Sequence, residues 1–190
     1  MTDRAIGLTM GDPAGIGPEI ICKALAAMSP AERASVVVLG NADVMARAAR
    51  IVGADLVFGD DGRANGVALE DIPMAGEPVA FGRLDPRAGD AAYRAIRRGV
   101  ELALAGRIGC IVTAPINKEA LNRAGHHYDG HTGLLAALTG ARSSFMLLAS
   151  ETLSVVHVST HVSLRTAIDR ATPERILATI EAGNAHLTRI

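Results

Sequence analysis

The fold is decided by the stretch Thr9-Met10-Gly11-Asp12-Pro13-Ala14-Gly15-Ile16-Gly17-Pro18-Glu19. A short apolar run before it predicts a strand over residues 5–10, and the apolar pattern after it predicts a helix over residues 18–28. A strand that ends in a glycine-rich loop and continues as a helix is where α/β proteins place ligands. Because glycine lacks a Cβ atom, backbone N–H groups in such a loop can approach a ligand closely. The alternative interpretation is a tight turn that binds nothing.

This loop matches neither of the two common phosphate-binding loops. Its glycines at positions 11, 15 and 17 do not follow the Gly-x-Gly-x-x-Gly pattern of dinucleotide-binding proteins. Gly17 is followed by Pro18 and Glu19, where a P-loop requires lysine and then serine or threonine. The sequence of this loop therefore excludes both of these phosphate-binding motifs.

Strand and helix patterns alternate along the remaining chain. The β-branched run at residues 35–40 and the apolar run Cys110–Thr113 predict buried strands, and Asn41 predicts the N-cap of the following helix. Further strands are predicted at residues 54–58, 67–69, 145–148 and 153–159, and helices at residues 41–52, 89–105, 116–124, 132–138 and from Pro173 onward, with Thr172 as the cap. This alternation predicts an α/β fold, a sheet covered by helices.

Composition restricts the class of protein. Apolar residues make up 49% of the 190 residues, and 19 basic residues against 20 acidic ones leave a net charge of -1. The chain has no excess of positive charge that would attract nucleic acid or an anionic membrane, so neither is an expected partner. No apolar run has the length of a membrane span, and the N-terminus lacks the apolar region of a signal peptide. Cys22 and Cys110 lie in separate apolar runs, which predicts two buried, reduced thiols in a cytoplasmic protein.

Histidines concentrate in one region of the chain, which indicates a site: His126, His127, His131, His157 and His161. Within this region, Gly130-His131-Thr132 precedes a predicted helix. An imidazole and a hydroxyl at a helix N-terminus form a donor-rich pocket for a phosphate or a carboxylate. In the alternative interpretation, Thr132 only caps the helix and His131 is an ordinary loop residue.

Two further motifs follow predicted strands. Lys118 ends the turn Ala114-Pro115-Ile116-Asn117-Lys118, where it can pair with an anionic substrate or be a surface lysine at a helix start. Lys118 and Asp12 are the candidate catalytic residues, and neither is assigned a step. His157 and His161 lie at the end of the strand predicted over residues 153–159, on one face if that strand stays extended. We expect His157 to pack within the sheet and His161 to be placed for a ligand.

Together the motifs resemble the N-terminal part of the PdxA family, 4-hydroxythreonine-4-phosphate dehydrogenase of pyridoxal phosphate (vitamin B6, pyridoxine) biosynthesis and its close relatives. They are Thr9–Glu19, Thr113–Lys118, Gly130-His131-Thr132 and Ser159-Thr160-His161, in this order and at this spacing. The resemblance implies a two-lobed α/β fold like that of isocitrate and isopropylmalate dehydrogenases, truncated at the C-terminus. Residues 1–190 would be its N-terminal portion, with a lobe boundary expected near residues 105–130. It also implies a homodimer.

The resemblance implies an oxidoreductase that is NAD-linked (or NADP-linked) and dependent on a divalent metal such as zinc, magnesium or cobalt. It would oxidise and decarboxylate a phosphorylated hydroxy acid, foremost 4-hydroxythreonine 4-phosphate, with His131 and Thr132 as substrate-binding residues and His161 as a metal ligand. Related phosphorylated sugar acids or cyclic diol carboxylates are alternative substrates, and a catalytically silent binding or dimerisation module is the alternative class. Most cofactor-binding residues of the family would follow Ile190, so the 190-residue chain itself is expected to be inactive.

Overall fold

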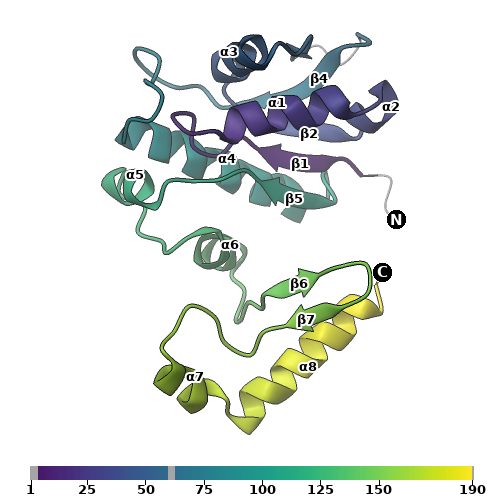
Figure 1. Ribbon diagram of the computed structural model, residues 1–190, viewed down its shortest axis with the longest axis vertical. Helices are drawn as coiled ribbons and strands as arrows, with labels where there is room; N and C mark the ends of the chain where they lie inside the picture. The colour runs from purple at the N-terminus through teal and green to yellow at the C-terminus, as the bar shows by residue number, and fades with distance from the viewer. Residues whose placement is uncertain (1–3, 60–62, 190) are drawn as a thin grey trace. The chain divides into compact units, whose positions relative to one another are not determined.

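The structure is a computed structural model that describes residues 4–59 and 63–189 (Figure 1). The chain divides into two compact units after Gly140, Thr2–Gly140 and Ala141–Ile190. The lobe boundary expected near residues 105–130 concerns the complete two-lobed fold and stays a prediction. None of the helices in the described part of the chain is long and apolar enough to cross a membrane.

The first unit is built on a parallel sheet with the strand order β3-β4-β2-β1-β5. Its strands are β1 (Ile6–Thr9), β2 (Val36–Gly40), β3 (Val57–Phe58), β4 (Gly66–Asp71) and β5 (Cys110–Thr113). Its helices are α1 (Gly17–Ala27), α2 (Pro30–Arg33), α3 (Ala42–Val52), α4 (Pro86–Leu104), α5 (Lys118–Arg123) and α6 (His131–Thr139). The predicted alternation of strands and helices is confirmed, and Asn41 caps α3 by accepting a hydrogen bond from the Val44 amide at 3.1 Å.

Two helical layers cover the sheet. Helices α1 and α3 pack against each other on one face, and α4 lies on the other face against β1, β2 and β5 (Figure 1). Right-handed crossovers explain this arrangement, because the chain moves in one direction from β1 to β3 and α4 carries it back past β2 and β1 to β5. The core on the α1 and α3 face is aliphatic and sulfur-rich, with Met10, Ile21, Leu25, Val38 and Met45 among its buried members.

Strand β5 has the predicted bounds, but its burial was predicted wrongly. Among the residues that the structure describes, it lies at the edge of the sheet, and its side chains alternate between exposed and half-buried. Cys110 is therefore exposed, whereas Cys22 on α1 is buried as expected. A run of four apolar or β-branched residues does not reveal whether a strand has one neighbour or two.

The second unit is a small α/β element. Strands β6 (Leu147–Ala149) and β7 (Ser154–Val156) form an antiparallel hairpin, followed by α7 (Leu164–Arg170) and α8 (Pro173–Leu187). Thr172 caps α8 as predicted, by accepting a hydrogen bond from the Arg175 amide. The guanidinium of Arg175 donates to the Val158 carbonyl at 2.9 Å and stacks on the Phe145 ring at 4.2 Å, which holds α8 to the segments that flank the hairpin.

Candidate functional site

The candidate site lies where the direction of the sheet connections reverses. From β1 the chain proceeds to β2 on one side, and it returns on the other side of β1 at β5. In open α/β sheets this reversal opens a crevice at the carboxyl ends of the two strands that flank it, here β1 and β5. Those ends carry the glycine-rich loop at residues 10–16 and the turn at residues 114–117.

The two loops are joined through their backbones. The amide of Asp12 donates a hydrogen bond of 2.9 Å to the carbonyl of Pro115. Gly11 has a φ of +72°, and a Cβ atom there would lie 2.4 Å from the same carbonyl oxygen. The loop sequence thus requires glycine at this position for two reasons, conformation and close approach.

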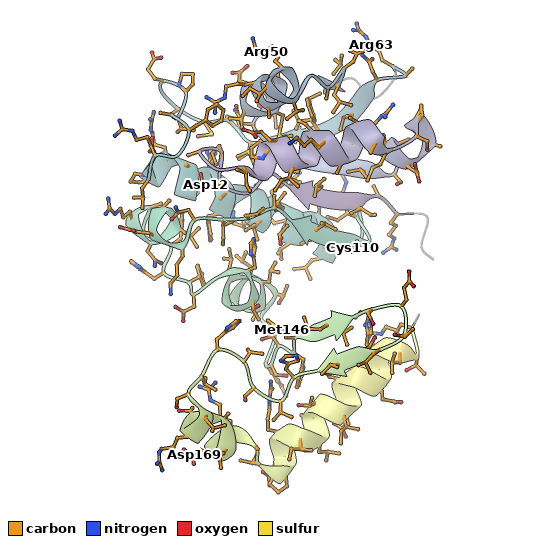
Figure 2. All side chains as sticks on the ribbon, in the orientation of Figure 1. Asp12, Arg50, Arg63, Cys110, Met146 and Asp169 are labelled. Atoms are coloured by element: carbon orange, nitrogen blue, oxygen red, sulfur yellow. The ribbon has the colours of Figure 1, made fainter. Side chains whose placement is uncertain are left out.

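Asp12 lies in the loop that follows β1 (Figure 2). Its side chain is buried, because only 6% of the residue's surface is exposed. Its carboxylate accepts a hydrogen bond of 2.8 Å from the Ala14 amide, which closes the loop on itself. Burial raises the pKa of Asp12, the Ala14 hydrogen bond opposes that effect, and the negative charge of Asp85 adds to it. The observed contact of the Asp12 side chain is to the loop backbone, and its candidate catalytic role stays a prediction.

A residue that the sequence did not single out holds the other side of this loop. The half-buried guanidinium of Arg47, on α3, donates to the Val79 carbonyl at 3.0 Å and to the Pro13 carbonyl at 3.4 Å. It stacks on the ring of Phe81 at 4.0 Å, and the amide of Gly82 donates to the Ala14 carbonyl at 2.8 Å. The only sequence signal was a basic residue on a helix face that is otherwise apolar.

Lys118 begins α5, and its Nζ atom lies 2.8 Å from the carboxylate of Asp129. The hydrogen bond from Lys118, together with its charge, lowers the pKa of Asp129. Both side chains are solvent-exposed, so the pair contributes little to stability. It connects the start of α5 to the turn that precedes His131.

His131 occupies the first position of α6, and Gly130 is the N-cap without any side-chain cap. Thr132 is exposed and does not cap the helix, so that alternative interpretation is wrong. Burial lowers the pKa of His131, while an interaction with the backbone of Ala114 opposes this shift. The lowered pKa favours the neutral imidazole, and the buried Nε2 atom has no hydrogen-bond partner among the described residues. An unpaired buried polar atom is costly, and a ligand would satisfy it.

The interaction with Ala114 places His131 beside the turn that follows β5. Three segments of the first unit therefore meet: the glycine-rich loop, the turn at residues 114–117 and the N-terminus of α6. They offer backbone N–H groups, a neutral imidazole and a hydroxyl. This set of groups suits an anionic, hydroxylated small molecule.

His161 belongs to the second unit. Strand β7 ends at Val156, so His157 and His161 do not share an extended strand as expected. The amide of His157 still pairs with the Met146 carbonyl at 2.9 Å, and its side chain is half-buried. His161 is exposed with a φ of +55°, a conformation that no other non-glycine residue in the described ranges adopts. Such outliers cluster at functional sites.

The described residues do not form a complete metal centre. Residues 4–59 and 63–189 contain no group of three or more His, Cys, Asp or Glu side chains that can hold a metal ion. Metal sites of the zinc type use three or more protein ligands. His161 can supply one imidazole, which does not complete such a site.

The parallel sheet, with helices on both faces and a candidate site in the loops at its carboxyl edge, defines an α/β protein. Residues 32–190 match the family model described as pyridoxal phosphate biosynthetic protein PdxA. The chain is 44% identical over 202 residues to the D-threonate 4-phosphate dehydrogenase of Pectobacterium atrosepticum, a match that covers 98% of the chain and 60% of that protein. The chain belongs to the PdxA family.

Other comparisons agree with this assignment. The 4-hydroxythreonine-4-phosphate dehydrogenase of Geobacter metallireducens is 39% identical over 196 residues, and the match covers 99% of the chain and 58% of that protein. The crystal structure of a 4-hydroxythreonine-4-phosphate dehydrogenase from Burkholderia phymatum superposes with a TM-score of 0.88 at 41% identity, over 97% of this chain and 58% of that one. The predicted family and fold class are confirmed, and the chain spans about 58% of the length of such relatives.

Proposed function

We propose that this chain forms part of an enzyme that oxidises a four-carbon hydroxy acid phosphorylated at its fourth carbon, with NAD or NADP as the hydride acceptor. The observation that carries the proposal is the half-buried imidazole of His131, whose Nε2 atom is buried and unpaired, at the N-terminus of α6. A helix N-terminus without a side-chain cap attracts a phosphate or a carboxylate through its free N–H groups and its dipole.

Two substrates of this class are candidates. D-threonate 4-phosphate is favoured by the name of the relative that is 44% identical. 4-Hydroxythreonine 4-phosphate, the substrate expected from the sequence, is supported by relatives that are 39% identical. The two acids differ at their second carbon, which carries a hydroxyl group in the first and an amino group in the second. In both, His131 and Thr132 would hold the polar groups of the substrate.

His161 is proposed as one ligand of a divalent metal, zinc, magnesium or cobalt. A divalent metal held in part by His161 would supply Lewis-acid chemistry to the reaction. The proposal rests on the strained backbone and exposed imidazole of His161. Further ligands would have to come from outside the described residues, because these contain no complete ligand group.

We also propose a cytoplasmic homodimer. Its support is the apolar surface of the second unit, where Leu164 and Ile168 on α7 and Ile180 on α8 are 79%, 67% and 62% exposed. Side chains of this size are seldom left uncovered in a group, and such surfaces mark interaction sites or cause self-association. The two free cysteines suit a reducing compartment.

The test is a joined protein: residues 1–190 followed by the part of the Pectobacterium atrosepticum D-threonate 4-phosphate dehydrogenase that they do not match. We expect it to form NADH from NAD with one of the two phosphorylated acids and a divalent metal. The 190-residue chain alone is expected to form none. A folded joined protein that binds either acid but never reduces NAD or NADP would favour the catalytically silent module instead.

A further inference from the structure

A second histidine, His126, anchors the turn that leads to the candidate site. Its Nε2 atom lies 3.1 Å from a carboxylate oxygen of Asp90 on α4. Its ring stacks on Tyr93, one helical turn further along α4, with centroids 3.7 Å apart and planes inclined by 11°. The ring of Tyr128 extends this stack, at 6.4 Å from Tyr93. The turn is therefore fastened to α4 by an ionisable hydrogen bond and by stacked rings at once.

The anchor is itself held in place. Asp90 also accepts a hydrogen bond of 2.8 Å from the Nε atom of Arg94, which fixes the carboxylate toward His126. Helix α4, which carries Asp90, closely approaches α5, which ends at Arg123 shortly before His126: a Cβ atom at Gly89 would lie 2.2 Å from the Ala120 carbonyl oxygen. His126 and Tyr93 are both half-buried, so their contact is shielded from water in part.

The anchored turn leads directly into α6. Residues 127–130 separate His126 from His131. Gly130 has a φ of 148°, which glycine adopts more readily than other residues, so the residue just before the helix adds conformational freedom. The Lys118–Asp129 pair also contacts this turn, but both of its side chains are solvent-exposed. The contacts of His126 are the stronger restraint on where α6 begins.

We propose that His126, bonded to Asp90 and stacked on Tyr93, is a positioning residue that fixes the start of α6 and keeps the His131 imidazole half-buried against the turn after β5. This inference rests on the proposed function in one respect, because the substrate-binding role of His131 belongs to that proposal. Asp90, Tyr93, His126 and His131 all belong to the first unit.

The test follows the titration of the His131 ring by NMR in the 190-residue chain, without any substrate. In His126→Ala, which removes both contacts, we expect α6 to loosen and the pKa of His131 to rise toward the ordinary value of histidine, because burial is what lowers it. His126→Phe keeps the stacked ring and removes the hydrogen bond, so its shift should be smaller. Amide exchange at Leu134, which bonds to the Gly130 carbonyl, should become faster in the same order.

His127→Ala is the matched control, because His127 is the exposed neighbour of His126. It should leave the His131 titration unchanged, as should Tyr93→Phe, which keeps the stacked ring. An unchanged His131 pKa and unchanged Leu134 exchange in folded His126→Ala would overturn the proposal. If that variant does not fold, the same unchanged readouts in His126→Phe and Asp90→Ala would overturn it. The two proposals fail separately. Absence of turnover in the joined protein would not change the His131 titration, and an unchanged His131 titration would not exclude turnover.

Discussion

Asp12 and Pro115, more than a hundred positions apart in the sequence, share a backbone hydrogen bond of 2.9 Å. It joins the loop after β1 to the turn after β5. These two strands are neighbours in the sheet, and ligands of α/β proteins bind at the carboxyl ends of such strands. The same turn contacts His131 through Ala114. The candidate site therefore depends on this junction before any side chain meets a ligand.

Gly11→Ala should break that junction. The substitution forces a residue with a Cβ atom into a φ of +72° and places that atom 2.4 Å from the Pro115 carbonyl. We expect the free energy of unfolding in urea to fall by about 1–3 kcal/mol or more. Gly133→Ala, inside α6 with nothing within 4 Å of the added atom, should instead be neutral or stabilising. Equal losses in the two variants would contradict the role assigned to Gly11.

His131 should make stability depend on pH in a defined direction. Burial holds its folded-state pKa below that of the unfolded chain, so the unfolded state binds more protons between the two values. The stability linked to neutral His131 is fully present above the unfolded-state pKa and is lost as pH falls through the folded-state pKa. His131→Gln should flatten this part of the profile, measured by urea unfolding at several pH values, whereas His127→Gln should not.

Thr132→Val tests the substrate-binding role in the joined protein. The change keeps the shape of the side chain and removes a hydroxyl that makes no cap, so stability should hardly change. Losing a hydrogen bond to a charged substrate group costs roughly 1.5–3 kcal/mol, so kcat/KM should fall by about one to two powers of ten. Thr139→Val, near the other end of α6, is the control. Unchanged kinetics in Thr132→Val would make Thr132 a bystander.

Arg47→Lys should weaken the hold on the glycine-rich loop. Lysine keeps the charge but cannot reach the Val79 and Pro13 carbonyls with two nitrogens and stack on Phe81 at once. We expect a loss of about 1–3 kcal/mol in the free energy of unfolding. Arg50→Lys, at an exposed position on the same helix, should stay within about 0.5 kcal/mol. The idea fails if calorimetry or denaturation finds the two variants alike.

His161→Ala separates metal binding from folding. His161 is exposed, so its removal should leave the thermal midpoint of the joined protein nearly unchanged. Turnover should fall severely and bound metal, measured by atomic emission, should decrease, because an imidazole ligand is lost. His186→Ala, on exposed α8 surface, is the control. Normal metal content and normal turnover in His161→Ala would remove His161 from the ligand set.

Local features of the fold followed from the sequence because their causes are local. Asn41 and Thr172 cap their helices through backbone amides only three residues away. The Gly130-His131-Thr132 motif was found from its residue types, although the burial of His131 was not. The sequence predicted a strand over residues 153–159, but β7 ends at Val156. The strand-like sequence continues beyond the last residue that pairs with β6, so the sequence did not show where pairing stops.

By itself, then, the sequence determined the alternation of strands and helices, the glycine-rich loop after β1, and the family to which the chain belongs. Only the tertiary structure decided that β5 is an edge strand in the described sheet, with an exposed Cys110. It also decided that Arg47 donates a hydrogen bond to the Pro13 carbonyl, and that His126 pairs with Asp90 and stacks on Tyr93. The physical reason is the distance along the chain between partners. Periodicity and capping act over a few residues, whereas burial, edge position and side-chain pairing depend on which distant segments the fold brings together.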